Sequence, residues 1–404
     1  MRYLSVILPL VLIGAVAVFS WLVTWLGALV IASPIKPPDR AHWTERARSA
    51  FPLWSFTAFT PVVLGFLFIV MVPVVLQIDD APQASWVAGT TALAAFIMSM
   101  LASTGTEARV RGREVSLLDT VKGWLITVLL FLPSLAVFGA MIPFLPSRLN
   151  WHAAIVMAVA VLVILILRYG GDLFVLRTFG LLREPPAALR EMVARLAADA
   201  GVQCRCYVVE WKSANAVAFT STNVVAFSTS MLEIMDEKEL AAVASHEIAH
   251  LCEPRRAQLA RFFGSFLFLP VFAAGPIIGT FGFGGFVIGL AFTALGYSGL
   301  QRVARAMEVR ADAAGHASEV DEGCYARALE KLYAYNLVPA VLRQKRMTHP
   351  HLYDRLLAAG VTPAYPRPAP PPNWPTLVAD FIVAMSAFMF ISFLGAVIHL
   401  LAGI

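Results

Sequence analysis

The sequence is poor in charged residues and in cysteine. Only 14% of its 404 residues are Asp, Glu, Lys or Arg, whereas soluble domains average about 25%. Four cysteines in a chain of this length are too few for a disulfide-stabilised scaffold. Sparse charge, together with 59% hydrophobic residues and a mean hydropathy of +0.73, argues against a single water-soluble globule. The composition therefore predicts a multi-pass integral membrane protein.

Long uncharged runs predict about eight transmembrane helices, because roughly 20 apolar residues in a helix cross the hydrocarbon core. The first run, Tyr3–Ser33, exceeds the roughly 7–15 residues of a signal-peptide core, so we interpret it as a retained helix. Two helices are expected back to back within Phe262–Gln301, turning at its glycines. The other candidates are Thr60–Ile78, Trp86–Ser103, Trp124–Leu145, Trp151–Leu167 and Phe381–Leu401.

Basic residues predict the orientation of these helices. Several lie between the first and second helices and between the third and fourth, whereas the alternate loops contain almost none. By the positive-inside rule, the polar segments Arg168–Arg261 and Arg302–Pro375 are expected in the cytoplasm, and we expect the membrane to be a bacterial inner membrane. The clusters Arg109–Arg113 and Arg255-Arg256 flank spans, so we interpret them as contacts to lipid headgroups and expect no nucleic-acid partner.

The polar and apolar segments alternate along the chain. We expect membrane helices at 1–167, a polar part at 168–261, a membrane hairpin at 262–301, a second polar part at 302–364, a Pro-rich linker at 365–375 and a last helix at 376–404. The first polar part predicts a small α/β module with a helix at Pro186–Ala200. Three short strands, expected as an antiparallel meander, follow at Tyr207–Trp211, Asn215–Thr220 and Asn223–Ser228.

A metal-binding pattern lies on the next helix. Asp236 and Glu239 form a capping-box pattern at its start, and Pro254 disfavours helix beyond Glu253. Within it, His246-Glu247-Ile248-Ala249-His250 puts two imidazoles on nearly the same face. With a third protein ligand they would form a catalytic zinc site, and Glu247 could take a proton from a water molecule at the metal. The alternative is a helix with two surface histidines.

The third ligand should be an acid or a histidine on another helix. On the residues alone, four candidates compete: Glu253, Glu308, Asp312 and His316. The order of the motifs, HEIAH, an apolar hairpin and then Glu308-Val309-Arg310-Ala311-Asp312, resembles the HtpX-like membrane zinc peptidases and the related zinc CAAX prenyl endopeptidases. Two further segments extend this resemblance: Asn215–Thr220 is similar to the family's NAFA strand, and Thr348-His349-Pro350 with Leu352 and Arg355 to its THPxLxxR element. Val309, where an aromatic is usual, and His351, where proline is frequent, depart from the pattern without removing a ligand.

The resemblance implies a role for each residue. Zinc would be bound by His246, His250 and Glu308, with Asp312 holding a ligand histidine and Glu247 acting as the base. His349 would stabilise the oxyanion, or else be a structural histidine beside a proline turn. Asp312 could instead form a surface ion pair with Arg305 or Arg310. A strand formed by Asn215, Ala216, Val217, Ala218 and Phe219 would bind the substrate backbone at a sheet edge, or be an ordinary strand.

These expectations describe a mainly α, polytopic membrane protein with a small cytoplasmic α+β zinc peptidase domain of the gluzincin type, interrupted by a membrane hairpin. As the HtpX resemblance implies, its substrates would be polypeptides associated with the bilayer, such as misfolded membrane proteins. A CAAX-type prenyl-peptide endopeptidase is one alternative. A non-catalytic membrane scaffold or transporter is another. The sequence leaves the oligomeric state open.

Overall fold

The computed structural model of the protein describes residues 4–36, 40–76, 81–343, 350–372 and 374–402. These residues are mainly helical and form two compact units. One unit contains residues 1–121 and 369–404, and the other contains residues 122–368.

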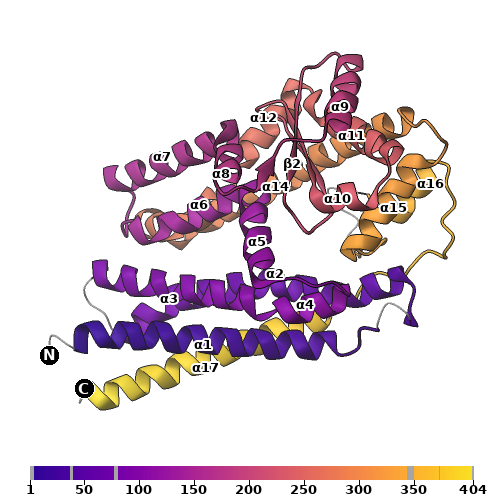
Figure 1. Ribbon diagram of the computed structural model, residues 1–404. Coiled ribbons are helices and arrows are strands. Elements are labelled where there is room, and N and C mark those ends of the chain that lie inside the picture. Colours follow the sequence, from indigo (N-terminus) through magenta and orange to yellow (C-terminus); the bar gives the residue numbers. More distant parts are fainter. Residues whose placement is uncertain (1–3, 37–39, 77–80, 344–349, 373, 403–404) are drawn as a thin grey trace. The chain divides into compact units, whose positions relative to one another are not determined.

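The first unit is a bundle of apolar helices. The packing places α2 (Trp43–Leu76) against α1 (Leu4–Ala32), α3 (Ala81–Ala102) and α17 (Trp374–Ala402), with the short α4 (Thr104–Arg111) beside α1 and α3 (Figure 1). Large apolar side chains lie on both sides of these helices: some are fully buried, including Phe56, Leu64 and Phe68, and others are exposed, including Leu10, Phe66 and Phe393. Helices that are apolar all round are typical of membrane spans.

The described part of the chain contains six helices long and apolar enough to cross a membrane, or seven if one bent pair is counted. The bent pair overlaps the span expected at Trp124–Leu145 and begins seven residues before it: α5 (Leu117–Phe131) meets the segment that begins with α6 (Pro133–Met141) at 93°. Pro133 has no N–H to continue the preceding helix, which explains the bend. The structure thus supports about six apolar helices, against the eight expected from the sequence.

The hairpin expected within Phe262–Gln301 has two unequal limbs. Its first limb is broken into α12 (Arg255–Gly264), α13 (Leu269–Phe272) and the start of α14 (Ala274–Ala317). The chain turns at Gly282, whose φ of 68° and ψ of −176° suit glycine and few other residues. The returning limb packs against the first one, where the Thr293 hydroxyl donates to the Leu267 carbonyl at 3.1 Å. It then continues without interruption to Ala317.

The second unit also contains a four-stranded sheet. Its strands are β1 (Leu182–Arg183), β2 (Arg205–Val209), β3 (Ala216–Phe219) and β4 (Val224–Ser228), in the order β1-β2-β4-β3. The predicted antiparallel meander is therefore only partly correct. The expected antiparallel pairing of β3 with β4 is confirmed, but β2 pairs in parallel with β4 and not antiparallel with β3. Every residue of β4 is buried, whereas β3 is only partly buried. Burial on both faces favours β4 as a central strand, and it leaves β3 at the edge.

Helices surround this sheet. Both α9 (Ala187–Asp199), which matches the helix predicted at Pro186–Ala200, and α11 (Glu237–Leu251) pack against the strands, and α11 also contacts α14 and α15 (Cys324–Asn336) (Figure 1). The remaining helices of this unit are α7 (Trp151–Ile166), α8 (Asp172–Thr178), α10 (Thr229–Ile234) and α16 (Leu352–Ala358). The result is that α11, the returning limb of the hairpin and α15 meet on one side of the sheet.

Candidate metal centre

Helix α11 begins where the capping pattern predicted. The Asp236 carboxylate accepts a hydrogen bond from the Glu239 N–H at 2.9 Å, and the Glu239 carboxylate accepts one from the Asp236 N–H at 3.0 Å. The helix ends at Leu251, two residues before the predicted end at Glu253, with Cys252 as its C-cap. The buried face of this helix carries both His246 and His250.

A buried acid on α14 meets these two histidines. The Nε2 atom of His246 lies 3.7 Å from Oε2 of Glu308, and Nε2 of His250 lies 3.6 Å from Oε1 of the same carboxylate. One ligand atom from each of the three residues lies within 4.8 Å of the others. Zinc bonds of about 2.0–2.1 Å at a tetrahedral centre place ligand atoms about 3.4 Å apart, so the three side chains need only small movements to share one ion. Two imidazoles and a carboxylate are also a donor set typical of zinc.

The outer nitrogen of His246, which is the Nδ1 atom that faces away from Glu308, is held by a buried network. Its Nδ1 atom lies 2.7 Å from the Tyr325 hydroxyl and 3.2 Å from Oδ1 of Asp312. Tyr325 donates its own proton to Asp312 at 2.8 Å. Burial raises the pKa of Tyr325 well above its usual value, so the phenol stays protonated and can donate.

Arg355 completes this network. It donates to both oxygens of Asp312, at 2.8 and 2.6 Å, with its side chain 7% exposed. Burial acts to lower the pKa of Arg355, but its interactions with Tyr325 and Asp312 outweigh burial and raise it, so the guanidinium stays charged. The bidentate contact fixes the carboxylate that lies beside His246.

His250 has a separate outer partner. Its Nδ1 atom lies 2.7 Å from Oε1 of Glu253, and Arg261 donates to both oxygens of Glu253, at 2.9 and 2.5 Å. Burial acts to raise the pKa of Glu253, but the bonds to His250 and Arg261 outweigh it and hold the pKa below the usual range. The carboxylate is therefore ionised at neutral pH.

The outer contacts determine which nitrogens can bind a metal. Because Nδ1 of each histidine lies against a carboxylate or a hydroxyl, each Nε2 can present its lone pair towards Glu308. Burial opposes a positive charge on His250, but Glu253, Glu247 and Glu308 outweigh burial and raise the pKa of its imidazole. The same carboxylates would attract a divalent cation, so the group fits a metal both geometrically and electrostatically.

The structure separates the competing ligand candidates. Glu253 and Asp312 contact the outer nitrogens of the histidines, and His316 lies 3.2 Å from Glu319 instead. Of the four candidates, only Glu308 has its carboxylate beside the Nε2 atoms of both His246 and His250. Asp312 lies beside His246, where the resemblance expected it, and its carboxylate is bound by Arg355, whereas Arg310 donates to the Cys252 carbonyl.

The other predicted site residues lie as follows. Glu247 follows His246 on α11 and is buried. Residues 216–219 form the edge strand β3, which α11 contacts, and Asn215 precedes this strand. His349 lies outside the described residues, so its role stays a prediction.

Sequence reasoning missed three residues around this site: Glu253 as a partner of His250, Arg261 and Tyr325. Glu253 carries a usable signal, because an acid three residues after a ligand histidine can lie beside it at the end of a helix. Arg261 and Tyr325 carry no signal, since their contacts depend on how α12 and α15 pack.

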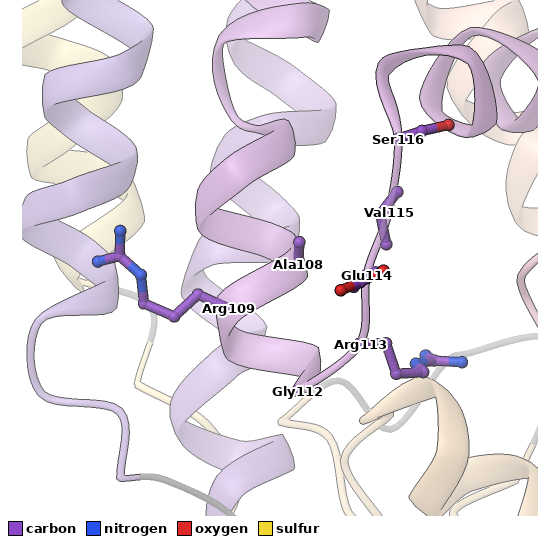
Figure 2. Close-up of a pocket in the computed structure, with 7 residues that line it drawn as sticks. All are labelled: Ala108, Arg109, Gly112, Arg113, Glu114, Val115 and Ser116. Atoms are coloured by element: carbon purple, nitrogen blue, oxygen red, sulfur yellow. The ribbon is translucent and has the colours of Figure 1, made fainter.

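The first unit has a surface hollow of about 600 Å³. Its lining is a single stretch of chain around Gly112, and it includes no residue of the metal-binding group. Figure 2 shows that Arg109 and Arg113 point in opposite directions. Because these charged groups do not converge, we do not interpret this hollow as a catalytic or ligand-binding site.

Comparison with known proteins identifies a peptidase family whose matched segment contains the metal-binding group. Residues 184–360 match Peptidase family M48, the family of HtpX and the CAAX prenyl endopeptidases, and they form a domain of that family. The matched segment contains the sheet from β2 onward, α11, the apolar hairpin and the residues of the metal-binding group. No curated protein matches the chain. Members of this family are metal-dependent peptidases, typically with zinc.

Proposed function

We propose that the protein is a membrane-embedded zinc metalloendopeptidase that cleaves membrane-associated or misfolded proteins at the cytoplasmic face. One observation carries most of the proposal. Two imidazole Nε2 atoms face one carboxylate at 3.7 and 3.6 Å inside a Peptidase family M48 domain. Six long apolar helices support the location in a membrane.

Each buried residue of the group has a distinct task in peptide hydrolysis. His246, His250 and Glu308 would hold zinc, which when bound polarises a peptide carbonyl and makes a water molecule more acidic. The Glu247 carboxylate would accept the proton of this water and pass it to the nitrogen of the leaving peptide. Burial of Glu247 keeps its carboxylate away from bulk solvent, so proton transfer stays local. His349 is expected to donate a hydrogen bond to the oxyanion.

Substrate would bind along the edge strand β3. Among the described strands, β3 pairs with β4 on one side only, so its other edge would offer N–H and C=O groups to an extended peptide. The Asn215 N–H donates to the Ser228 hydroxyl at 2.9 Å, which fixes the start of the strand. Because α11 contacts β3, a peptide added at this edge would lie near the helix that carries His246 and His250.

The function is tested by cleavage with a matched metal measurement. Purified full-length protein in detergent is incubated with unfolded casein, and bound zinc is quantified in the same sample. We expect Glu247→Gln to retain zinc and to lower the cleavage rate by about 10²–10⁴-fold, the usual contribution of a general base. Glu237→Gln, an exposed acid at the start of the same helix, should cleave like the parent. Equal cleavage by the parent and Glu247→Gln overturns the proposed function.

A second substrate separates quality control from prenyl-peptide processing. The same protein is given one peptide with and without a prenylated C-terminal cysteine. We expect cleavage of unfolded casein and of the unmodified peptide. Cleavage of the prenylated peptide alone would contradict the proposed substrate class while leaving the chemistry in place.

A further inference from the structure

Glu253 is a buried carboxylate that the proposed reaction does not use. Its side chain is 1% exposed, and it lies between His250 and Arg261. Its backbone is fixed as well: Pro254 follows it, and the Gln258 side chain donates to the Glu253 carbonyl at 3.1 Å. A charged group held this firmly beside a metal-ligand histidine suggests a role in orienting the ring.

Arg261 comes from a different element than the ligands. It lies on α12, the first helix of the apolar hairpin, one turn after the buried Ala257 and on the same face. The opposite face of α12 is exposed and carries Arg255 and Arg256, followed by the apolar Leu259 and Phe263. Basic residues followed by exposed apolar ones indicate a helix that enters a membrane from its surface. The inner face of this helix therefore connects the hairpin to the metal-binding group.

We propose that Glu253 and Arg261 are a positioning pair: Glu253 orients the His250 imidazole for metal binding, and Arg261 ties that orientation to the membrane hairpin. The inference rests on the proposed function, because it concerns a ligand of the same zinc site.

Arg261 has two physical effects on Glu253. Its two hydrogen bonds, at 2.9 and 2.5 Å, use both carboxylate oxygens and fix the plane of the group. They also neutralise a buried charge that would otherwise be costly to keep ionised. With the carboxylate fixed and charged, Nδ1 of His250 keeps its proton and Nε2 keeps its lone pair for the metal.

The test measures zinc affinity by competition with a chromogenic chelator, on full-length protein in detergent. Glu253→Gln removes the charge beside His250, and we expect the zinc dissociation constant to rise about 10- to 100-fold. Arg261→Gln should raise it about 10-fold, and Arg261→Lys by less, because lysine keeps the charge without the two-point contact. Arg256→Gln, on the exposed face of the same helix, is the matched control and should stay within about twofold of the parent.

Two further measurements separate positioning from general stabilisation. Because Glu253 and Arg261 act in series, the double variant should bind zinc about as weakly as Glu253→Gln alone. The visible absorption of Co²⁺-substituted protein, which reports ligand geometry, should shift in Glu253→Gln and Arg261→Lys and not in Arg256→Gln. Circular dichroism of the metal-free variants verifies that each one folds, and Arg261→Lys provides the test if the glutamine variants do not.

The outcomes distinguish this inference from the proposed function. Zinc affinities within twofold of the parent and unchanged Co²⁺ spectra in the folded variants overturn the positioning pair and leave a zinc-binding parent intact. Additive losses in the double variant also overturn it, because two independent sites would then be involved. A parent protein that binds no zinc overturns both proposals together.

Discussion

The buried contact between Arg355 and Asp312 allows a quantitative prediction about stability. Arg355 links α16 to α14 and also donates to the Tyr325 hydroxyl at 3.1 Å. The substitution Arg355→Met keeps much of the side-chain volume and removes the positive charge. The variant leaves the Asp312 carboxylate beside His246 without its guanidinium partner.

The magnitude follows from burial. Removing one partner of a buried ion pair costs about 3–5 kcal/mol, because the other charge is left uncompensated. The Asp312 side chain is 20% exposed, so water can replace part of the lost interaction. We therefore expect a loss of about 2–4 kcal/mol in the free energy of opening this region, which corresponds to a population of open molecules about 30- to 900-fold larger.

Cys324 provides the assay. It is fully buried in α15, next to Tyr325, so a thiol reagent reaches it only when this helix opens. With the other three cysteines replaced by alanine and a reagent slow enough for the helix to reclose, the labelling rate is proportional to the open population. We expect Arg355→Met to be labelled about 30- to 900-fold faster than its parent.

A surface ion pair serves as the control. Arg367 and Asp354 form a similar two-point contact, but their side chains are 48% and 44% exposed. Because exposed pairs contribute at most about 1 kcal/mol, Arg367→Met should change the rate by less than about fivefold. Equal labelling rates in Arg355→Met and Arg367→Met would refute the argument that burial gives the Asp312 contact its strength.

Three further predictions concern other parts of the protein. Asp236→Ala removes the N-cap of α11 and should cost about 1 kcal/mol in urea unfolding at neutral pH. Because the hydrogen bond from the Glu239 N–H lowers the pKa of Asp236, this contribution is present above the ordinary pKa and is lost as the pH falls through the lower folded-state value. An equal cost at neutral pH and in strong acid would contradict this prediction. Burial raises the pKa of Cys206 to about 12, so iodoacetamide at neutral pH should leave this thiol unmodified until the protein is denatured. Detection of modified Cys206 in the folded protein by mass spectrometry would contradict this prediction. Gly282→Ala places a residue with a side chain at a backbone φ of 68° and should destabilise the hairpin by about 1–3 kcal/mol. Gly284→Ala, at a helical position with open space around it, should be neutral or stabilising. Similar melting temperatures for both variants would argue against strain at the turn.

The local parts of the site could be predicted from the sequence because they depend on neighbouring residues. The spacing of His246 and His250 follows from helix geometry, and the start of α11 follows from the side chains of Asp236 and Glu239. Glu308 lies far along the chain, so its choice over three competitors came from the resemblance alone. Its position beside the histidines depends on the turn at Gly282 and the length of the returning limb.

The parts that failed or were missed depend on packing between distant segments. The order of β3 and β4 in the sheet could not be predicted, because alternation along a strand shows which residues face the core and not which strand is its neighbour. Two membrane helices were expected back to back in the hairpin, whereas its first limb is broken near Pro270 and only the second is long enough to span. Tyr325 and Arg261 reach the histidines only through the placement of their helices.

The central claim is that His246, His250 and Glu308 bind one divalent ion. X-ray absorption at the zinc edge tests it directly on the purified full-length protein. We expect one zinc per chain, a shell of nitrogen and oxygen at about 2.0–2.2 Å, outer-shell scattering from two imidazoles, and loss of stoichiometric zinc in Glu308→Ala. A shell of sulfur at about 2.3 Å, or full zinc content in Glu308→Ala with an unchanged spectrum, would contradict the claim.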